Sequence, residues 1–153
     1  MTDQDFMNVA LKEAQKSYKQ DEVPVGAVIV DLKTGTIIAK AHNKTEHGAD
    51  PTKHAEITAI QKACRKRGTK RLWGCAMYVS LEPCTMCAAA ISFARIEKLF
   101  IGATDEKGGA VINGVCFFES KTCHFKPDVC HGLMAEESAK LLQDFFKTKR
   151  SKT

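Results

Sequence analysis

Four side chains that can bind a metal or move a proton stand in two short stretches of this sequence. The stretch "HAEI" holds His54 and Glu56, and the stretch "EPCTMC" holds Cys84 and Cys87. Two cysteines three residues apart at the start of a helix direct both sulfur atoms to the same side of its first turn, so one metal ion can contact both. His54, at the start of another predicted helix, is a suitable third ligand, and thiolates with a neutral imidazole are typical ligands of zinc.

Three protein ligands leave one corner of a tetrahedral zinc site free for water, which is typical of a catalytic zinc. Glu56 lies next to this site, and we interpret it as the group that takes a proton from that water and passes it to a leaving group. Each motif alone has a simpler explanation, because a helical histidine is usually a core or surface residue and paired cysteines can be redox-active or merely buried. Together, each at a predicted helix start, they favour the catalytic interpretation.

The size and composition of the chain predict one compact domain. Its 153 residues are 44% hydrophobic and 27% charged, which is enough to bury a core. We expect a single zinc-dependent domain over residues 1–153, with a basic tail at 147–153 that could be mobile. The N-terminal stretch is acidic and no apolar run reaches membrane-spanning length, so we expect a cytoplasmic protein without a membrane segment. Seven cysteines then indicate reduced thiols, metal ligands or small buried residues.

Basic residues gather in two places on a chain whose net charge is +5. Such clusters suit a polyanionic partner, but from charge alone a solvated, lysine-rich surface is an equally good explanation. The clusters are Arg65, Lys66, Arg67, Lys70 and Arg71, and then Lys147, Lys149, Arg150 and Lys152.

Apolar periodicity predicts the elements that position these residues. A helix is expected over Phe6 to Tyr18, followed by two strands, "VPVGAVIV" and "TIIAKA", that form a hairpin. The pair Asp50 and Pro51 is a helix-start signal, which would put the "HAEI" motif in the first helical turn. That helix should end near Gly68.

The second half of the chain predicts a strand, a helix and a strand, "AMYVS", "CTMCAAAISFA" and "KLFIG", and hence a parallel strand pair. A last amphipathic helix runs from Leu133 to Phe146, whose aromatic end, Phe145 and Phe146, belongs to the core or stacks on bases. The segment from Cys116 to Val129 has no clear pattern. The sum is a three-layer α/β/α domain, with helices on both faces of one mixed sheet.

Over nearly its whole length the sequence resembles the cytidine deaminase superfamily, and within it the bacterial tRNA-specific adenosine deaminases. The resemblance rests on "EVPVGAVIV", "HNKTEHGADPTKHAEI", "YVSLEPCTMCAAAI", "ARIEKLFIGATDEKGGA", "TCHFKPDVCHG" and "LLQDFF". It implies a three-layer α/β/α cytidine deaminase-like fold with a single mixed five-stranded sheet, in a protein that forms homodimers. It also implies one Zn²⁺ per chain on His54, Cys84 and Cys87, with Glu56 as the catalytic residue.

The activity implied by the resemblance is hydrolytic deamination of adenosine to inosine at the wobble position of tRNA, with the anticodon stem-loop as partner. In that family an asparagine at the position of Asn43 pairs with the base, and the backbone amide at Ala55 faces it. Glu22 and Val25 match residues that line the nucleotide pocket, and Asp105 matches one that approaches the flanking nucleotides. Without the resemblance, Asn43 and Asp105 are ordinary turn and loop residues.

Two other functions fit the same motifs. A guanine, cytosine or nucleotide deaminase of the same superfamily would share the zinc ligands, and a non-catalytic zinc module that binds RNA would need a fourth protein ligand. Two Cys-His pairs, Cys123 with His124 and Cys130 with His131, could supply such a ligand or bind a second metal. The resemblance places this segment in the dimer or substrate region instead.

Overall fold

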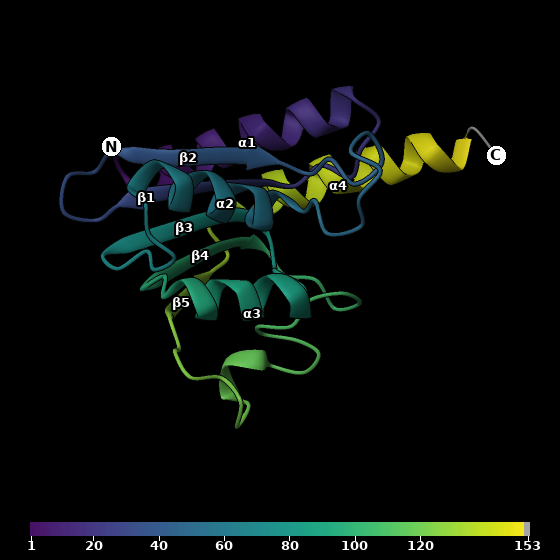
Figure 1. Cartoon of the computed structure of the whole chain (residues 1–153). Coiled ribbons are helices and arrows are strands. Elements are labelled where there is room, and N and C mark those ends of the chain that lie inside the picture. Colours follow the sequence, from purple (N-terminus) through teal and green to yellow (C-terminus); the bar gives the residue numbers. More distant parts are fainter. Residues whose placement is uncertain (152–153) are drawn as a thin grey trace.

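The computed structural model describes residues 1–151 of the chain, including side chains up to Lys149. Its centre is a five-stranded sheet with the strand order β2-β1-β3-β4-β5 (Figure 1). β1 is antiparallel to β2 and β3, whereas β3, β4 and β5 run parallel to one another. The strands are β1 (Gly26–Asp31), β2 (Ile37–His42), β3 (Cys75–Leu81), β4 (Lys98–Ala103) and β5 (Asp128–His131).

Helices cover both faces of the sheet, so the predicted three-layer α/β/α fold with one mixed sheet is confirmed. α2 and α3 lie on one face, and α1 and α4 lie on the other (Figure 1). The larger core cluster lies between the sheet and α2 and α3, and a second cluster lies under α1. The helices are α1 (Asp3–Lys19), α2 (Ala55–Arg67), α3 (Thr85–Ala94), the short 3-10 helix η1 (Phe117–Glu119) and α4 (Ala135–Ser151).

The β1–β2 hairpin and the parallel β3–α3–β4 unit follow the sequence prediction. The resemblance implied a fifth strand, but apolar periodicity did not locate it, because β5 has only four residues and is mostly exposed. Residues 147–151 of the basic tail belong to α4, while residues 152 and 153 lie outside the described part of the chain. No helix within residues 1–151 is long and apolar enough to cross a membrane.

The start of α2 differs from the sequence prediction. Asp50 and Pro51 do not begin the helix: the Asp50 carboxylate accepts hydrogen bonds from the backbone and hydroxyl of Thr52, which makes a turn. The helix begins at Ala55 with His54 as its N-cap, and α3 begins at Thr85 with Cys84 as its N-cap. Neither of these N-cap side chains caps its helix, so both are available to bind another partner.

Helix α1 packs closely on the first residue of β1. A Cβ at Gly26 would overlap the carbonyl oxygen of Ala10, so only glycine allows this approach. The Gly26 N–H donates to Ser80 Oγ of β3 at 3.0 Å, which joins the helix contact to the centre of the sheet. This contact also fixes the C-terminal part of α1, which carries Ser17 toward the end of β2.

Replacing Gly26 with alanine should lower the free energy of unfolding by about 3 kcal/mol, because helix backbone rather than a flexible side chain must move. Gly68→Ala is the matched comparison: a Cβ there meets nothing within 4 Å, and the left-handed backbone alone costs roughly 1 kcal/mol. Urea denaturation of both variants measures the difference. Equal losses of stability would mean that α1 can move away from β1 without cost.

Candidate active site

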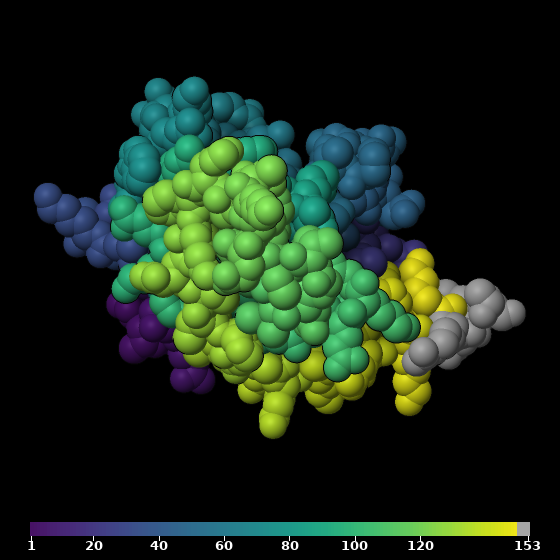
Figure 2. Space-filling view, turned by 90° about the horizontal axis from the view of Figure 1, so that it is seen from below, coloured from purple at the N-terminus to yellow at the C-terminus, as the bar shows by residue number. Residues whose placement is uncertain are grey.

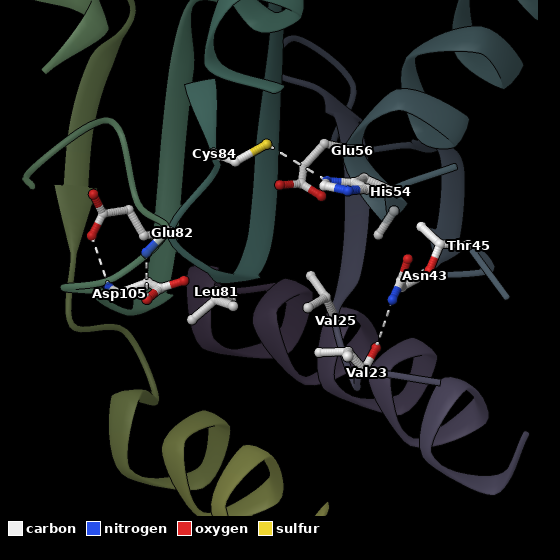
Figure 3. Close-up of a pocket in the computed structure, with 12 residues that line it drawn as sticks. Val23, Val25, Asn43, Thr45, His54, Glu56, Leu81, Glu82, Cys84 and Asp105 are labelled. Carbon is white, nitrogen blue, oxygen red and sulfur yellow. Dashed lines mark hydrogen bonds between the residues drawn. The ribbon is translucent and has the colours of Figure 1, made fainter. Parts of the chain in front are cut away.

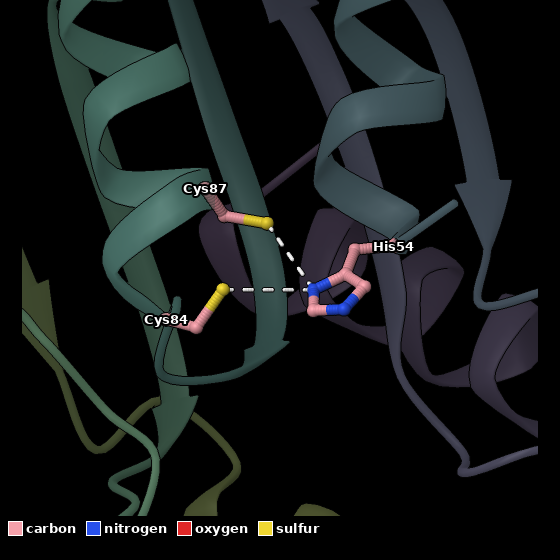
Figure 4. A group of neighbouring side chains, drawn as sticks. All are labelled: His54, Cys84 and Cys87. Atoms are coloured by element: carbon pink, nitrogen blue, oxygen red, sulfur yellow. Dashed lines mark hydrogen bonds between the residues drawn. The ribbon is translucent and has the colours of Figure 1, made fainter. Parts of the chain in front are cut away.

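The side chains of His54, Cys84 and Cys87 converge between the N-terminal ends of α2 and α3 (Figure 4). Their ligand atoms lie within 4.8 Å of one another, and His54 Nδ1 is 3.6 Å from Cys84 Sγ and 3.5 Å from Cys87 Sγ. With Zn–S near ~2.3 Å and Zn–N near ~2.0 Å, tetrahedral geometry separates a sulfur from a nitrogen ligand by roughly 3.5 Å. The spacing therefore fits a zinc ion held by these three side chains.

The charges in this region also favour a metal. Hydrogen bonds with Cys87 and His54 lower the pKa of the Cys84 thiol to about 4, so this ligand is a thiolate at neutral pH. The positive ends of two helix dipoles point toward the same place and further favour the Cys84 thiolate. The hydrogen bond with Cys84, together with burial, raises the pKa of the Cys87 thiol, which a cation bound to both sulfur atoms would lower. Among the residues that the structure describes, no fourth histidine, cysteine or carboxylate joins the group, which leaves one coordination position for a non-protein ligand.

Glu56 lies beside the metal ligands and faces the same pocket (Figure 3). The first turn of α2 carries it, so the helix that begins at His54 positions both the ligand and the carboxylate. Its side chain is buried, and burial raises the pKa of Glu56 to about 7. A carboxyl group with such a pKa can both accept and release a proton near neutral pH.

The pocket in front of the metal ligands is a cavity of about 320 Å³, which is large enough for a nucleobase. Ala55 lines it at the start of α2, where the first backbone N–H groups of a helix have no partner within the helix. Four further parts of the chain complete the wall: the loops before β1, after β2 and after β4, and the end of β3 with the residue that follows it (Figure 3). They contribute Val23, Val25, Asn43, Thr45, Leu81, Glu82, Asp105 and Gly108.

Asn43 presents an unpaired oxygen in this wall. The Asn43 side-chain Nδ2 donates to the Val23 carbonyl at 3.2 Å. The backbone carbonyl of Asn43 accepts a 2.8 Å hydrogen bond from Ser17 Oγ. His42 Nδ1 lies 3.0 Å from the same Ser17 hydroxyl. Asn43 Oδ1 has no partner although it is buried, and a buried polar atom without a hydrogen bond is costly. A ligand that donates a hydrogen bond at this position would satisfy it.

Two residues expected at the pocket, Val25 and Glu22, have different surroundings. Val25 lines the cavity, whereas the buried Glu22 carboxylate accepts hydrogen bonds from the backbones of Glu46 and His47, at 3.0 and 2.8 Å. His47 Nδ1 lies 2.9 Å from the same carboxylate. Glu22 therefore holds the loop that carries Thr45, and it is not among the residues that line the cavity.

Asp105, which the resemblance matched to a residue near the flanking nucleotides, also lines the pocket. Its side chain accepts hydrogen bonds from the backbone N–H groups of Lys107 and Gly108, at 3.1 and 3.0 Å. Its own N–H donates to Glu82 at 2.9 Å. Glu82 and Thr45 had no assigned role from the sequence, although Glu82 is the first residue of the "EPCTMC" motif and could have been considered on that ground.

Two shallow grooves continue from the pocket toward α4. The first is lined by Asp105, Lys107, Leu142, Phe146 and Lys149 among others, and the second by His47, Phe146 and Lys149 among others. The aromatic pair is divided: Phe145 is in the core against Tyr18, whereas Phe146 is 44% exposed and faces both grooves.

The other basic cluster is at the opposite end of α2 from His54. Helix α2 begins beside the metal ligands, and Arg65, Lys66 and Arg67 form its last turn. Arg67 pairs with Asp31, and Arg71 donates to the Phe93 carbonyl. This cluster therefore borders neither the pocket nor the two grooves, whereas Lys149 lines both grooves.

The two Cys-His pairs do not form a second metal centre. The only group of three or more candidate ligands within residues 1–151 is His54, Cys84 and Cys87. Cys123 instead donates to the Phe125 carbonyl at 3.1 Å and lies near Ser92, and Cys130 is exposed in β5. The fourth-ligand alternative for these residues is therefore not supported.

Replacing His54 with alanine should lower bound zinc from about one ion per chain to less than about 0.2, because two ligands hold the ion far more weakly than three. Cys130→Ser is the control, since this exposed cysteine lies outside the ligand group. Elemental analysis of both purified proteins measures zinc per chain. Full zinc content in the His54 variant would show that another group completes the site.

Comparison with known proteins agrees with this site. The family described as the cytidine and deoxycytidylate deaminase zinc-binding region matches residues 1–103. The tRNA-specific adenosine deaminase of Agrobacterium fabrum is 54% identical over 145 residues, which cover 95% of this chain and 94% of that protein.

Two solved structures show how the fold is shared. A chain from a study of A-to-I editing by tRNA:A34 deaminases matches with a TM-score of 0.87 and 54% identity, covering 90% of this chain and 99% of that chain. A guanine deaminase from Bacillus subtilis matches with a TM-score of 0.64 and 40% identity, covering 68% of this chain and 66% of that chain. With three zinc ligands, a neighbouring carboxylate and these relatives, the chain belongs to the cytidine and deoxycytidylate deaminase family and, within it, to the tRNA-specific adenosine deaminases.

Proposed function

We propose that this protein removes ammonia from adenosine at the wobble position of tRNA and so produces inosine. The observation that carries the proposal is the meeting of a three-ligand zinc site, the buried Glu56 and the unpaired Asn43 oxygen at one pocket. The residues 1–153 act as a single zinc-dependent domain in this proposal.

The reaction adds water to the base and releases ammonia, so each step needs a proton donor or acceptor. His54, Cys84 and Cys87 would hold the zinc ion, which when bound would supply an activated water for attack on the carbon that carries the amino group. Glu56 accepts the proton that the attacking water loses and delivers it to the leaving amine. Its pKa of about 7 suits both transfers at neutral pH.

The pocket orients the base through two polar groups that have free hydrogen-bonding capacity. Asn43 Oδ1 accepts a hydrogen bond from the base, and the backbone N–H of Ala55 at the start of α2 donates one. Val25 packs against the ring from the side of β1. These contacts restrict the base to one orientation, with its amino group toward Glu56.

A base within RNA, rather than a free base, is favoured by the grooves beside the pocket. The side chains of Phe146 and Lys149 border both grooves, and the Lys149 ammonium group also pairs with Asp21. Aromatic and cationic groups of this kind suit stacked bases and phosphates. An anticodon loop is already unpaired, so turning out its base costs less than breaking a duplex. Asp105 lies where the pocket meets the first groove, and in this proposal it contacts the neighbouring nucleotides.

A free-base deaminase is the second candidate, because the chain also resembles a guanine deaminase over 68% of its length. A closed pocket would favour this activity, but here the cavity opens into grooves that can hold further nucleotides. A non-catalytic zinc module is less well supported, since the described residues offer three ligands to the metal and not four.

The purified protein should convert adenosine to inosine in an anticodon stem-loop with a wobble adenosine, and Glu56→Gln should lower this rate roughly 10³-fold or more. Zinc content should stay near one ion per chain in the variant, because Glu56 is not among the ligands. Product analysis by chromatography measures both rates. Release of ammonia from free guanine, with no inosine from RNA, would favour the second candidate.

We also propose that two copies of the chain associate through α3 and the segment that follows β4. Phe93 of α3 is 61% exposed, and Ile112 and Val115 of the segment after β4 are 42% and 64% exposed. The same segment contacts α3 through η1. Figure 2, which views the molecule from below, shows the segment after β4 in green at the centre of this face. Several exposed large apolar side chains in one region indicate a protein interface.

As an enzyme of tRNA, the protein would act in the cytoplasm.

Replacing Phe93 with aspartate should shift the protein from dimer to monomer, because it puts a charge in an apolar contact. Leu32→Asp is the control, since Leu32 is also an exposed apolar residue but lies in the turn after β1. Light scattering over a range of protein concentrations measures the molecular mass. A monomeric wild-type protein, or a dimeric Phe93 variant, would contradict this interface.

A further inference from the structure

The first residue of the "EPCTMC" motif is a buried carboxylate that the proposed reaction does not use. Glu82 is only 2% exposed, and no ion pair among residues 1–149 involves it. A buried charge without a cation must be balanced by hydrogen-bond donors. The partners of Glu82 therefore indicate what its charge does in this protein.

All of these partners come from one loop, residues 105–113. Oε2 of Glu82 accepts hydrogen bonds from the backbone N–H groups of Val111, Ile112 and Asn113, at 3.0, 2.9 and 3.0 Å. Oε1 accepts them from the backbone of Asp105 at 2.9 Å and from Asn113 Nδ2 at 2.8 Å. Five donors thus surround one carboxylate, and hydrogen bonds to a charged group are stronger than those to a neutral group.

A glycine in the same loop gives independent support. A Cβ at Gly109 would overlap the Glu82 carboxyl group, so the loop passes too close to the carboxylate for any side chain there. The loop backbone also makes a hydrogen bond next to Glu82, because the Ala110 N–H donates to the Pro83 carbonyl at 2.9 Å. The loop therefore encloses the carboxylate and is also bonded to Pro83, the residue that follows Glu82.

The position of Glu82 joins this loop to the metal centre. Two residues later the chain reaches Cys84, the N-cap of α3 and a zinc ligand. At the other end of the hydrogen bonds, the loop places Asp105 and Gly108 in the pocket wall (Figure 3). One side chain thus fixes the distance between the wall that meets the substrate and the helix that holds the metal.

We infer that Glu82 is a positioning residue that holds the 105–113 loop against the α3 end of the pocket, so that the wall formed by Asp105 and Gly108 is ready for the nucleotides beside the target base. The part that concerns nucleotides rests on the proposed function. The part that concerns the loop does not.

Glu82→Gln tests this role because an amide cannot satisfy the same donors. A glutamine oxygen can accept from the three backbone N–H groups at one site, but its NH₂ then faces two further donors. Backbone amides of the 105–113 loop should exchange with deuterium roughly ten- to hundredfold faster, as expected for the loss of one or two hydrogen bonds to a charged group. KM for the wobble stem-loop should rise about tenfold with kcat nearly unchanged, and zinc should stay at about one ion per chain.

A second substitution should restore part of the loss. In the double variant Glu82→Gln with Asn113→Asp, the introduced amide can donate to the introduced carboxylate, so only the bond from Asp105 remains unmatched. Exchange and KM should both return toward wild-type values. Asn113→Asp alone places two carboxylates together and should be worse than wild type. A general loss of stability in the Glu82→Gln variant would not be repaired by the second substitution, Asn113→Asp.

Glu22→Gln is the matched control, because Glu22 is a buried carboxylate that accepts backbone hydrogen bonds from another loop. In the Glu22→Gln variant, deuterium exchange of the backbone amides should become faster at Glu46 and His47 and not at residues 105–113. If Glu82→Gln does not fold, Gly109→Ala gives the same test, since it keeps Glu82 but forces the loop away from it.

Several results would overturn the inference: unchanged exchange in the 105–113 loop, an equal rise across both loops, or loss of zinc in place of loss of loop order. The outcome is separable from the proposed function. If wild-type protein makes no inosine, the proposed activity is wrong, whereas the exchange measurements still decide whether Glu82 holds the loop.

Discussion

The close packing of two small-residue helices on one face of the sheet is the constraint on which the metal centre depends. Both helices begin at the same end of the strands. Their N-cap residues, His54 and Cys84, therefore meet only if the helices lie near each other. Alanine side chains permit this approach because they add little thickness between helix and sheet. The buried alanines are Ala55, Ala59 and Ala63 in α2, and Ala88 and Ala94 in α3.

Three buried carboxylates near the pocket show how surroundings give the same group different roles. Burial raises the pKa of Glu56 to about 7, which suits proton transfer. Burial also tends to raise the pKa values of Glu22 and Glu82, but hydrogen bonds from loop backbones outweigh it and hold both below their usual value. These two side chains stay charged and order loops. The number of donors around each carboxylate therefore separates an acid–base group from an anchor.

The site combines a rigid part with loops that define the substrate. The metal ligands and Glu56 come from helix starts that the core holds in place. The pocket wall comes from loops near Asn43, Thr45 and Asp105, each tied by hydrogen bonds to a buried side chain: Ser17, Glu22 or Glu82. A change in these loops can alter which nucleotides are accepted while the metal centre stays intact, and such a division is common in enzymes.

Local patterns in the sequence were enough to predict much of the fold and of the metal site. The hairpin of β1 and β2, the β3–α3–β4 unit and the end of α2 at Gly68 depend on apolar periodicity and turn residues that lie close together in the chain. The residue types and spacing of the "HAEI" and "EPCTMC" motifs likewise indicated zinc and a proton carrier. The start of α2 was wrong by four residues, because Asp50 satisfies a turn instead of a helix.

What the tertiary structure decided depends on contacts between distant parts of the chain. Strand β5 exists because β4 offers it an edge, and not because its own four residues favour a strand. Glu22 and Glu82 act on loops that lie more than twenty residues away in sequence, and Phe145 and Phe146 differ in burial although they are neighbours. No local pattern encodes these roles, since each is set by what the folded chain brings opposite the side chain.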